Sequence, residues 1–292
     1  MKRSFTLLEI IIVLVILGIV ASIGSEVVFR IYENYLLSQR LDQAQYSVEI
    51  AIDEIAKRLE KRIPGSAVIT NASLSEVDSI EIENPQSDQN IVQWVGKAYD
   101  SFRGEYNDSF YAPGWSGVID LNNSDKTHIT TPGSTLSYAE DIIHALSNGE
   151  VDLSQSNCGA ILVPNFETNY SAYGWSGSTG GFVYPVHREG NTTLRFDDTT
   201  SSKRISELYT LAWSAYAIVP ENENDGIFDL YLYYNFRPWK GDRFIDGESS
   251  LLARNISSFK VHKTHKIIEI YLCSNTPLGE QNVTACARRI IF

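Results

Sequence analysis

The sequence predicts an α+β fold, in which one long helix packs on one or two antiparallel β-sheets. A helical pattern of apolar residues runs from Phe5 to Arg62 without a proline, and Pro64-Gly65 then ends it. The remaining chain holds short runs of strand composition, and 11% of all residues are aromatic, a residue class that fits half-buried pleated surfaces. A helix with one apolar stripe needs an apolar partner, which a sheet with one apolar face supplies.

The apolar beginning of the chain predicts a membrane segment. From Phe5 to Ile23 the only ionisable residue is Glu9, and the basic residues Lys2 and Arg3 stand just before it. This stretch is long enough to cross a bilayer. Three interpretations are open: a cleaved secretory signal, a simple anchor, or a segment that uses Glu9. A carboxylate in hydrocarbon costs about 2.5–3.5 kcal/mol, which favours a functional role for Glu9.

The helical pattern continues beyond the membrane segment, whereas a signal peptide would end there. One apolar stripe is formed by Ile31, Tyr35, Leu41, Ala44, Val48, Ile52, Ile55 and Leu59. At 1.5 Å per residue, the predicted helix would be about 85 Å long.

The N-terminus resembles type IV prepilins and type II secretion pseudopilins. The resemblance rests on Ser4-Phe5-Thr6-Leu7-Leu8-Glu9 and the apolar run that follows. It implies that a prepilin peptidase cuts between Ser4 and Phe5 and methylates the new amine of Phe5. It also implies that Glu9 docks the subunit into a growing filament, where the amine of a neighbouring subunit compensates its charge.

The resemblance implies a domain division and a location. Residues 1–4 are the leader, 5–24 the transmembrane half of the helix, 25–63 its amphipathic half, and 64–292 the globular domain. The chain would cross the bacterial inner membrane once, with its N-terminus cytoplasmic and its globular domain periplasmic, and would be extracted into a periplasmic or surface filament. Its partners would be membrane lipid, other pilin or pseudopilin subunits, the inner-membrane assembly platform and the prepilin peptidase.

Two residues depart from the common pattern of the family. Ser4 stands where the family usually has Gly, a change expected to slow cleavage. Glu26 replaces a Pro frequent in major pilins, and this change, with a length above that of typical major pilins, points to a minor subunit that primes or caps the filament. The segment from Leu251 to Ile256, leading into Phe259, is similar to J-type or W-type minor subunits. Such a subunit is not an enzyme.

The alternative function is a pilus-associated binding subunit for DNA uptake or adhesion, and the net charge of the chain disfavours DNA binding. Lys plus Arg total 24 and Asp plus Glu total 36, so the formal charge is 24 − 36 = −12. A nucleic-acid partner is therefore not expected for the chain as a whole. The densest basic cluster, from Lys260 to Lys266 with Arg288-Arg289, would carry DNA contact, or would protect an exposed edge strand.

The globular part contains one predicted helix and nine predicted strands. The helix spans Tyr138 to Leu146, with Ser137 as its N-cap. The strands span Ser79–Ile82, Ile91–Val95, Ala160–Val163, Gly181–Tyr184, Thr193–Phe196, Tyr209–Val219, Phe228–Phe236, Ile256–Val261 and Ile267–Leu272. Within Phe228–Phe236 every second residue is predicted to face one side of the sheet.

Cysteine spacing predicts one disulfide. Cys273 and Cys286 enclose a turn-rich stretch, and their pairing in an oxidising compartment would stabilise the domain by about 3 kcal/mol. The pair is also similar to the disulfide-bounded region near the C-terminus of many pilins. Cys158 remains, and a buried thiol is expected there.

The sequence predicts no cofactor, with Ca²⁺ as the one candidate to weigh. Glu221, Glu223, Asp225 and Asp229 place oxygen ligands around Gly226, loosely like a calcium loop. The alternative is a solvated acidic hairpin turn at Asp225-Gly226.

A repeated tetrapeptide does not complete a hydrolase motif. Gly114-Trp115-Ser116-Gly117 and Gly174-Trp175-Ser176-Gly177 lack the final Gly of Gly-x-Ser-x-Gly. Each is expected to be a tight turn that packs a Trp, or else an exposed aromatic platform for a partner.

Overall fold

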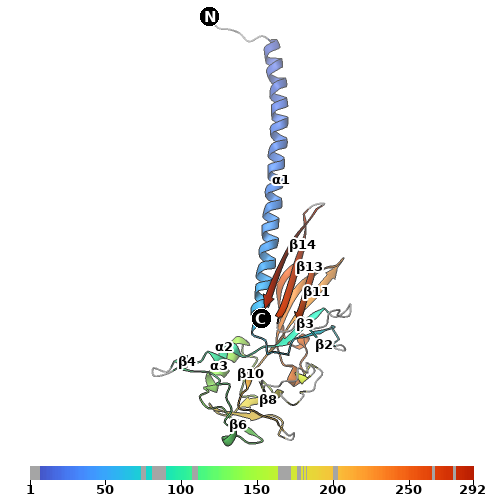
Figure 1. Ribbon diagram of the computed structural model, residues 1–292. Coiled ribbons are helices and arrows are strands. Elements are labelled where there is room, and N and C mark those ends of the chain that lie inside the picture. The colour runs from blue at the N-terminus through green and yellow to red at the C-terminus, as the bar shows by residue number, and fades with distance from the viewer. Residues whose placement is uncertain are drawn as a thin grey trace.

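The computed structural model combines one long helix with an eight-stranded and a five-stranded antiparallel sheet, which confirms the predicted α+β class (Figure 1). The structure describes residues 7–73, 77–80, 90–106, 111–163, 172–175, 179, 181, 183–199, 203–264, 267–278 and 281–292. Figure 1 shows the first half of the long helix projecting away from the folded part of the chain.

Helix α1 spans Leu7–Glu60, close to the predicted extent. Lys57 and Arg58 stand in its last turn, where positive charge is favourable next to the helix C-terminus. The chain then turns at Pro64-Gly65, with Gly65 at a positive φ of 83°. The buried side chains of α1 are Ala44, Val48, Ala51, Ile52, Ile55, Ala56 and Leu59.

The larger sheet has eight strands in the order β15-β14-β13-β12-β11-β3-β1-β2. Their bounds are β1 Val68–Thr70, β2 Val77–Ser79, β3 Ile91–Val95, β11 Ala215–Asn224, β12 Ile227–Phe236, β13 Glu248–Thr264, β14 Ile267–Leu278 and β15 Gln281–Ile291. Helix α1 packs on β13, β14 and β15. The buried stripe of the helix meets Ile268, Ile270 and Leu272 of β14 in one apolar core.

Strand β13 changes its partner halfway along its length. Its first half pairs with β12 as far as Ile256, and its second half pairs with β14 from Ile256 to Thr264. Asn255 lies at the change with a positive φ of 56°, and the register shifts on both sides of it. This bulge bends β13, so that its first half pairs with β12 and its second half with β14.

The smaller sheet belongs to a segment inserted between β3 and β11, which are neighbours in the larger sheet. Its strand order is β10-β7-β8-β9-β6. We term residues 99–212 the inserted lobe. Its elements are α2 Tyr99–Phe102, β4 Glu105–Tyr106, β5 Tyr111–Ala112, the 3₁₀ turn η1 Leu121–Asn123, β6 His128–Thr130, α3 Leu136–Leu146, β7 Gly159–Leu162, β8 Val183–Arg188, β9 Thr193–Phe196 and β10 Thr210–Ala212.

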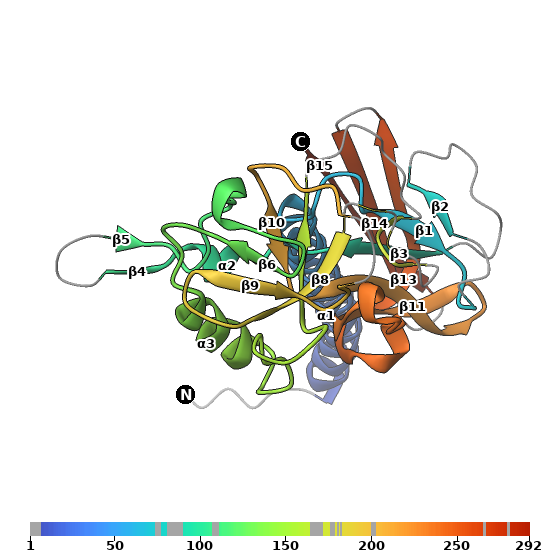
Figure 2. The ribbon, with the colours of Figure 1, turned by 90° about the horizontal axis from the view of Figure 1, so that it is seen from below.

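The inserted lobe lies beyond the C-terminal end of α1, on the side away from the N-terminus (Figure 1). Viewed along the helix in Figure 2, β6, β9 and α3 lie to one side and β13 and β14 to the other. Two further 3₁₀ turns, η3 Pro238–Lys240 and η4 Phe244–Asp246, connect β12 to β13.

Two local predictions in the inserted lobe and at its C-terminal boundary are wrong. The predicted strand Tyr209–Val219 is two strands in different sheets, β10 and β11, separated at Trp213-Ser214. Both halves are buried, so the apolar run contains no sign of the break. Ser137 is not the N-cap of α3, because the helix starts one residue earlier and the backbone N–H of Ser137 donates to Asn191 Oδ1 at 3.1 Å.

The predicted alternation along β12 holds for most of the strand. Leu230 and Leu232 are buried, and Phe228 and Tyr234 pack with them against the α1 core. Phe236 instead belongs to a different core cluster. Asn235, at a positive φ of 62°, breaks the alternation before it.

A disulfide joins Cys273 of β14 to Cys286 of β15, which lie directly opposite each other in the ladder. The sequence predicts a turn-rich stretch between the two cysteines. This stretch instead forms the two arms of a hairpin, which pair as far as Leu278 and Gln281. Pro277 is tolerated because the pairing of β14 with β13 has already ended at Ser274. Cys158 is a buried free thiol, as expected.

Replacing Ile55 by Ala should lower the free energy of unfolding by about 2–5 kcal/mol, because Ile55 is fully buried between α1 and the sheet. Ile50→Ala is a matched control, since Ile50 lies on the same helix with half of its side chain exposed. It should change stability by less than about 0.5 kcal/mol. Urea unfolding of the full chain in detergent measures both, and equal losses would contradict the packing described.

Replacing both Cys273 and Cys286 by Ser should lower the free energy of unfolding by about 3 kcal/mol, because the disulfide restricts the unfolded chain. Thermal unfolding with and without a reductant checks this. Reductant should lower the melting temperature of the wild-type chain and leave the double variant unchanged. A wild-type chain insensitive to full reduction would rule out a stabilising disulfide.

Candidate functional site

The N-terminal half of α1 fits a single-pass membrane anchor. It is long and apolar enough to span a bilayer, and none of its most apolar stretch is buried within the protein. The large apolar side chains from Leu7 to Ile23 are each at least 49% exposed. Because so much apolar surface cannot remain in water, this half of the helix needs lipid or other subunits around it.

Glu9 lies in the first turn of α1, among these apolar side chains, and is itself exposed. A carboxylate at the N-terminus of a helix is favoured by the helix dipole, yet a bilayer strongly disfavours its charge. Ser4 and Phe5, where cleavage and methylation are predicted, lie outside the described residues. These two processing residues therefore stay predictions.

The amphipathic stripe of α1 divides into a covered and an uncovered part. From Ala44 to Leu59 its residues are buried on the sheet, as predicted. Ile31 and Tyr35 are 63% and 61% exposed, and Leu41 is 42% exposed. The expectation that the chain's own sheet covers the whole stripe is therefore wrong, because the packing of the sheet against α1 begins only at Ala44. The uncovered part can contact another helix.

The acidic residues of the β11–β12 hairpin do not gather into a metal cluster. Glu221 pairs with Asp229 in the ladder, and the hydroxyl of Tyr233 donates a hydrogen bond to Glu221. Oδ1 of Asp229 accepts a bond of 3.3 Å from the backbone N–H of Asn255. Glu223 and Asp225 are exposed near the tip. Among the described residues no group of three or more His, Cys, Asp or Glu could hold a metal ion, and the calcium site stays a prediction.

The basic cluster near the C-terminus is partly neutralised by ion pairs. Arg288 bonds to Glu269 and Arg289 to Asp53, each at 2.6 Å. The bond from Arg289 lowers the pKa of Asp53, so this contact between α1 and β15 stabilises the fold above the usual carboxyl pKa and is lost as the pH falls. Fewer cations therefore remain for a phosphate backbone than the sequence suggested. His265 and Lys266 lie outside the described residues.

The tryptophans of the two repeated tetrapeptides pack in the interior, and Ser176 and Gly177 of the second tetrapeptide lie outside the described residues. Trp115 and Trp175 are 2% and 7% exposed, and the indole N–H of Trp115 donates to the carbonyl of Ala98 at 2.9 Å. The predicted burial is confirmed for both tryptophans, and the alternative of an exposed aromatic platform is wrong.

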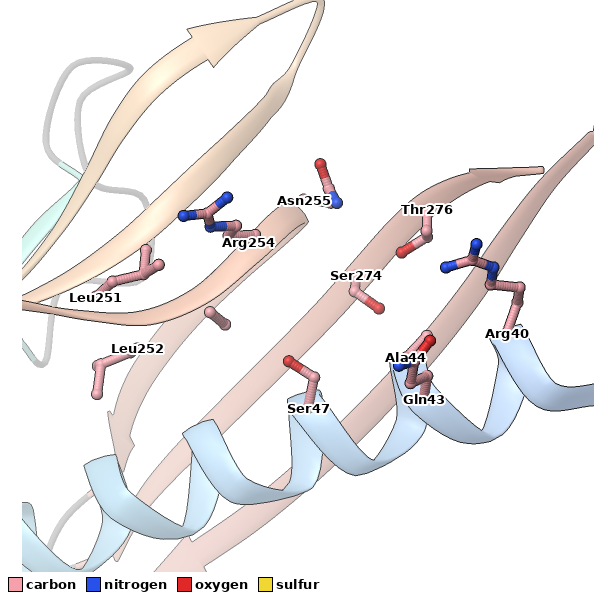
Figure 3. A pocket seen from close by; sticks show the side chains of 11 residues that line it. Arg40, Gln43, Ala44, Ser47, Leu251, Leu252, Arg254, Asn255, Ser274 and Thr276 are labelled. Atoms are coloured by element: carbon pink, nitrogen blue, oxygen red, sulfur yellow. The ribbon is translucent and has the colours of Figure 1, made fainter. Parts of the chain in front are cut away.

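Sequence reasoning missed a groove of 480 Å³ between α1 and the larger sheet, shown in Figure 3. Arg40 and Ser47 of α1 form one wall, and Arg254 and Ser274 of the sheet lie on the other side. No motif reveals it, since its walls come from opposite ends of the chain. The only sequence signal is the change from apolar to small polar residues after Leu272.

Comparison with known proteins gives one match. Residues 1–25 match the family model of the prokaryotic N-terminal methylation motif. No curated protein and no solved structure matches the chain. The motif implies association with other pilin subunits and with the prepilin peptidase. Together with the apolar helix and the disulfide, it supports a type IV pilin-like subunit.

Proposed function

We propose that this chain is a minor pilin or pseudopilin, a non-enzymatic subunit that primes or caps a type IV pilus or a type II secretion pseudopilus. The observation that carries the proposal is Glu9, a carboxylate at the start of an exposed apolar helix that bears the N-terminal methylation motif. The proposal assigns no catalytic residue.

Glu9 would drive assembly through the relief of an unfavourable charge. A carboxylate in hydrocarbon costs about 2.5–3.5 kcal/mol, and an opposite charge in hydrogen-bonding distance offsets that cost. After cleavage, Phe5 of a neighbouring subunit would supply an ammonium group at the same depth in the membrane. Stacked helices would therefore be more stable than isolated ones.

The inserted lobe supports a position at the end of the filament. It lies beyond the C-terminal end of α1, where a further subunit stacked along the helix direction would pack (Figure 1). A subunit inside a filament leaves that space to its neighbour, whereas a subunit at the tip does not. The uncovered stripe with Ile31 and Tyr35 would face the helices of the subunits below.

The proposed location is the bacterial inner membrane. Lys2 and Arg3 precede the apolar segment, and basic residues favour the cytoplasmic side, so the globular domain would be periplasmic. The oxidised pair Cys273–Cys286 suits that compartment. The inner-membrane assembly platform would extract the subunit into the filament.

Mass spectrometry of the chain purified from its native cells should give a mature N-terminus at an N-methylated Phe5. Cells without the prepilin peptidase should yield the chain with Met1 to Ser4 still attached. A chain that begins at Met1 in wild-type cells, or one cut near Ser25, would contradict the proposal.

Replacing Glu9 by Ala should reduce incorporation into filaments at least tenfold, because the paired charge is lost. The variant should still enter the membrane and fold, since the substitution removes an unfavourable charge from lipid. Glu26→Ala is the matched control, because Glu26 lies on the same helix and forms an exposed pair with Arg30. The fraction of chain in sheared filaments measures both. Normal incorporation of Glu9→Ala would defeat the proposed role.

A further inference from the structure

The groove between α1 and the larger sheet exists because small side chains face each other across the packing interface. On β14 the residues that face the helix change from Ile268, Ile270 and Leu272 to Ser274 and Thr276. The facing helix presents Ala44 and Ser47 (Figure 3). Small residues on both sides cannot fill the space that isoleucine and leucine fill further along.

The bulge of β13 lies at one side of the same groove. Asn255, with its positive φ, lies where β13 leaves β12 and joins β14, and it lines the groove together with Arg254. The residues of the bulge therefore form part of the groove wall.

The groove has polar side chains on both walls beside apolar surface from Leu251, Leu252 and Ala253, and it carries positive charge. Arg40 extends from α1 toward the strands, and Arg254 lies on the rim (Figure 3). Neither guanidinium has an ion-pair partner within the part of the chain that the structure describes. Planar guanidinium groups match carboxylates and phosphates in geometry as well as in charge.

Ser274 provides an independent sign of a ligand. It is 3% exposed, and its Oγ has no hydrogen-bond partner among the described residues. A buried hydroxyl without a partner costs about 1–3 kcal/mol. Its side chain points into the groove opposite Ser47, so a polar group bound there would satisfy it.

The position of the groove argues against a lipid headgroup. Arg40 lies 40 − 24 = 16 residues beyond the predicted membrane half, which is about 24 Å along the helix. The headgroup layer extends only about 5–8 Å beyond the hydrocarbon. The groove does adjoin the uncovered stripe at Leu41, where another subunit's helix would lie under the proposed function.

We propose that this groove binds a carboxylate-bearing segment of a neighbouring pilin-like subunit. Arg40 pairs with the carboxylate, Arg254 adds positive charge at the rim, and Ser274 supplies a hydrogen bond at the groove floor. The proposal rests on the proposed function for the nature of the partner, while its chemistry comes from the groove itself.

The test is site-specific photo-crosslinking of the full chain in its native cells. A benzophenone amino acid at Thr276, which lines the groove, should crosslink to a pilin-like subunit at a segment that contains Asp or Glu. Crosslinking to a segment without a carboxylate, to lipid or to DNA would overturn the proposal, as would a subunit that assembles without any crosslink at this position.

Two variants separate binding from folding. Ser274→Leu fills the groove and continues the apolar pattern of β14, so it should keep or raise the melting temperature while lowering the crosslink at least tenfold. The double variant Arg40→Glu with Arg254→Glu should lower the crosslink yield equally. Arg204→Glu, at an exposed arginine of the inserted lobe, should leave the crosslink yield unchanged. An acidic-to-Lys change in the crosslinked partner segment should restore the signal in the double-Glu variant. A crosslink that survives Ser274→Leu or the double reversal would refute the groove's role.

The outcomes also distinguish this proposal from the proposed function. If Glu9→Ala blocks incorporation but the groove variants leave the crosslink unchanged, only the groove assignment fails. If Glu9 is dispensable while the groove still crosslinks to an acidic segment, the filament assignment fails and the groove remains.

Discussion

The packing of one helical stripe on three strands organises this molecule. Ile52, Ile55 and Leu59 are fully buried against β14 and its neighbours, and together they anchor the C-terminal half of α1 to the larger sheet. Because a helix is stiff, fixing its second half also determines the direction in which its first half projects. The apolar N-terminal half is thereby held clear of the globular part, where it can enter a membrane or a bundle of similar helices.

The same packing creates the surface on which the proposed contacts depend. This packing stops at Ala44, so the apolar side chains before it stay uncovered, and the small residues next to it leave a groove that carries positive charge. A membrane segment, an uncovered stripe and a cationic groove therefore follow one another along a single helix. This order suits a subunit that contacts neighbours along its whole length.

The inserted lobe adds a second sheet without disturbing the first. Strands β3 and β11 remain hydrogen-bonded neighbours although the whole lobe lies between them in the chain. An insertion at that point extends the molecule beyond the end of α1 and leaves the helix interface unchanged. A partly buried ion pair between Arg188 and Glu140 connects β8 to α3, and an apolar core supports the lobe.

The sequence by itself determined the features that depend on local pattern. The apolar run with Glu9, the stripe from Ala44 to Leu59, the strands at Ile91–Val95 and Thr193–Phe196 and the buried Cys158 can all be recognised from periodicity and composition, because each residue's environment follows from its neighbours in the chain. The tertiary structure decided what depends on distant partners. The tertiary structure divided one apolar run into β10 and β11 of different sheets. It also left the apolar stripe of α1 uncovered from Ile31 to Leu41. It also placed Arg40 and Ser274 in the walls of one groove. Strand pairing and the space left between elements depend on residues far apart in the chain, so the local sequence does not determine them.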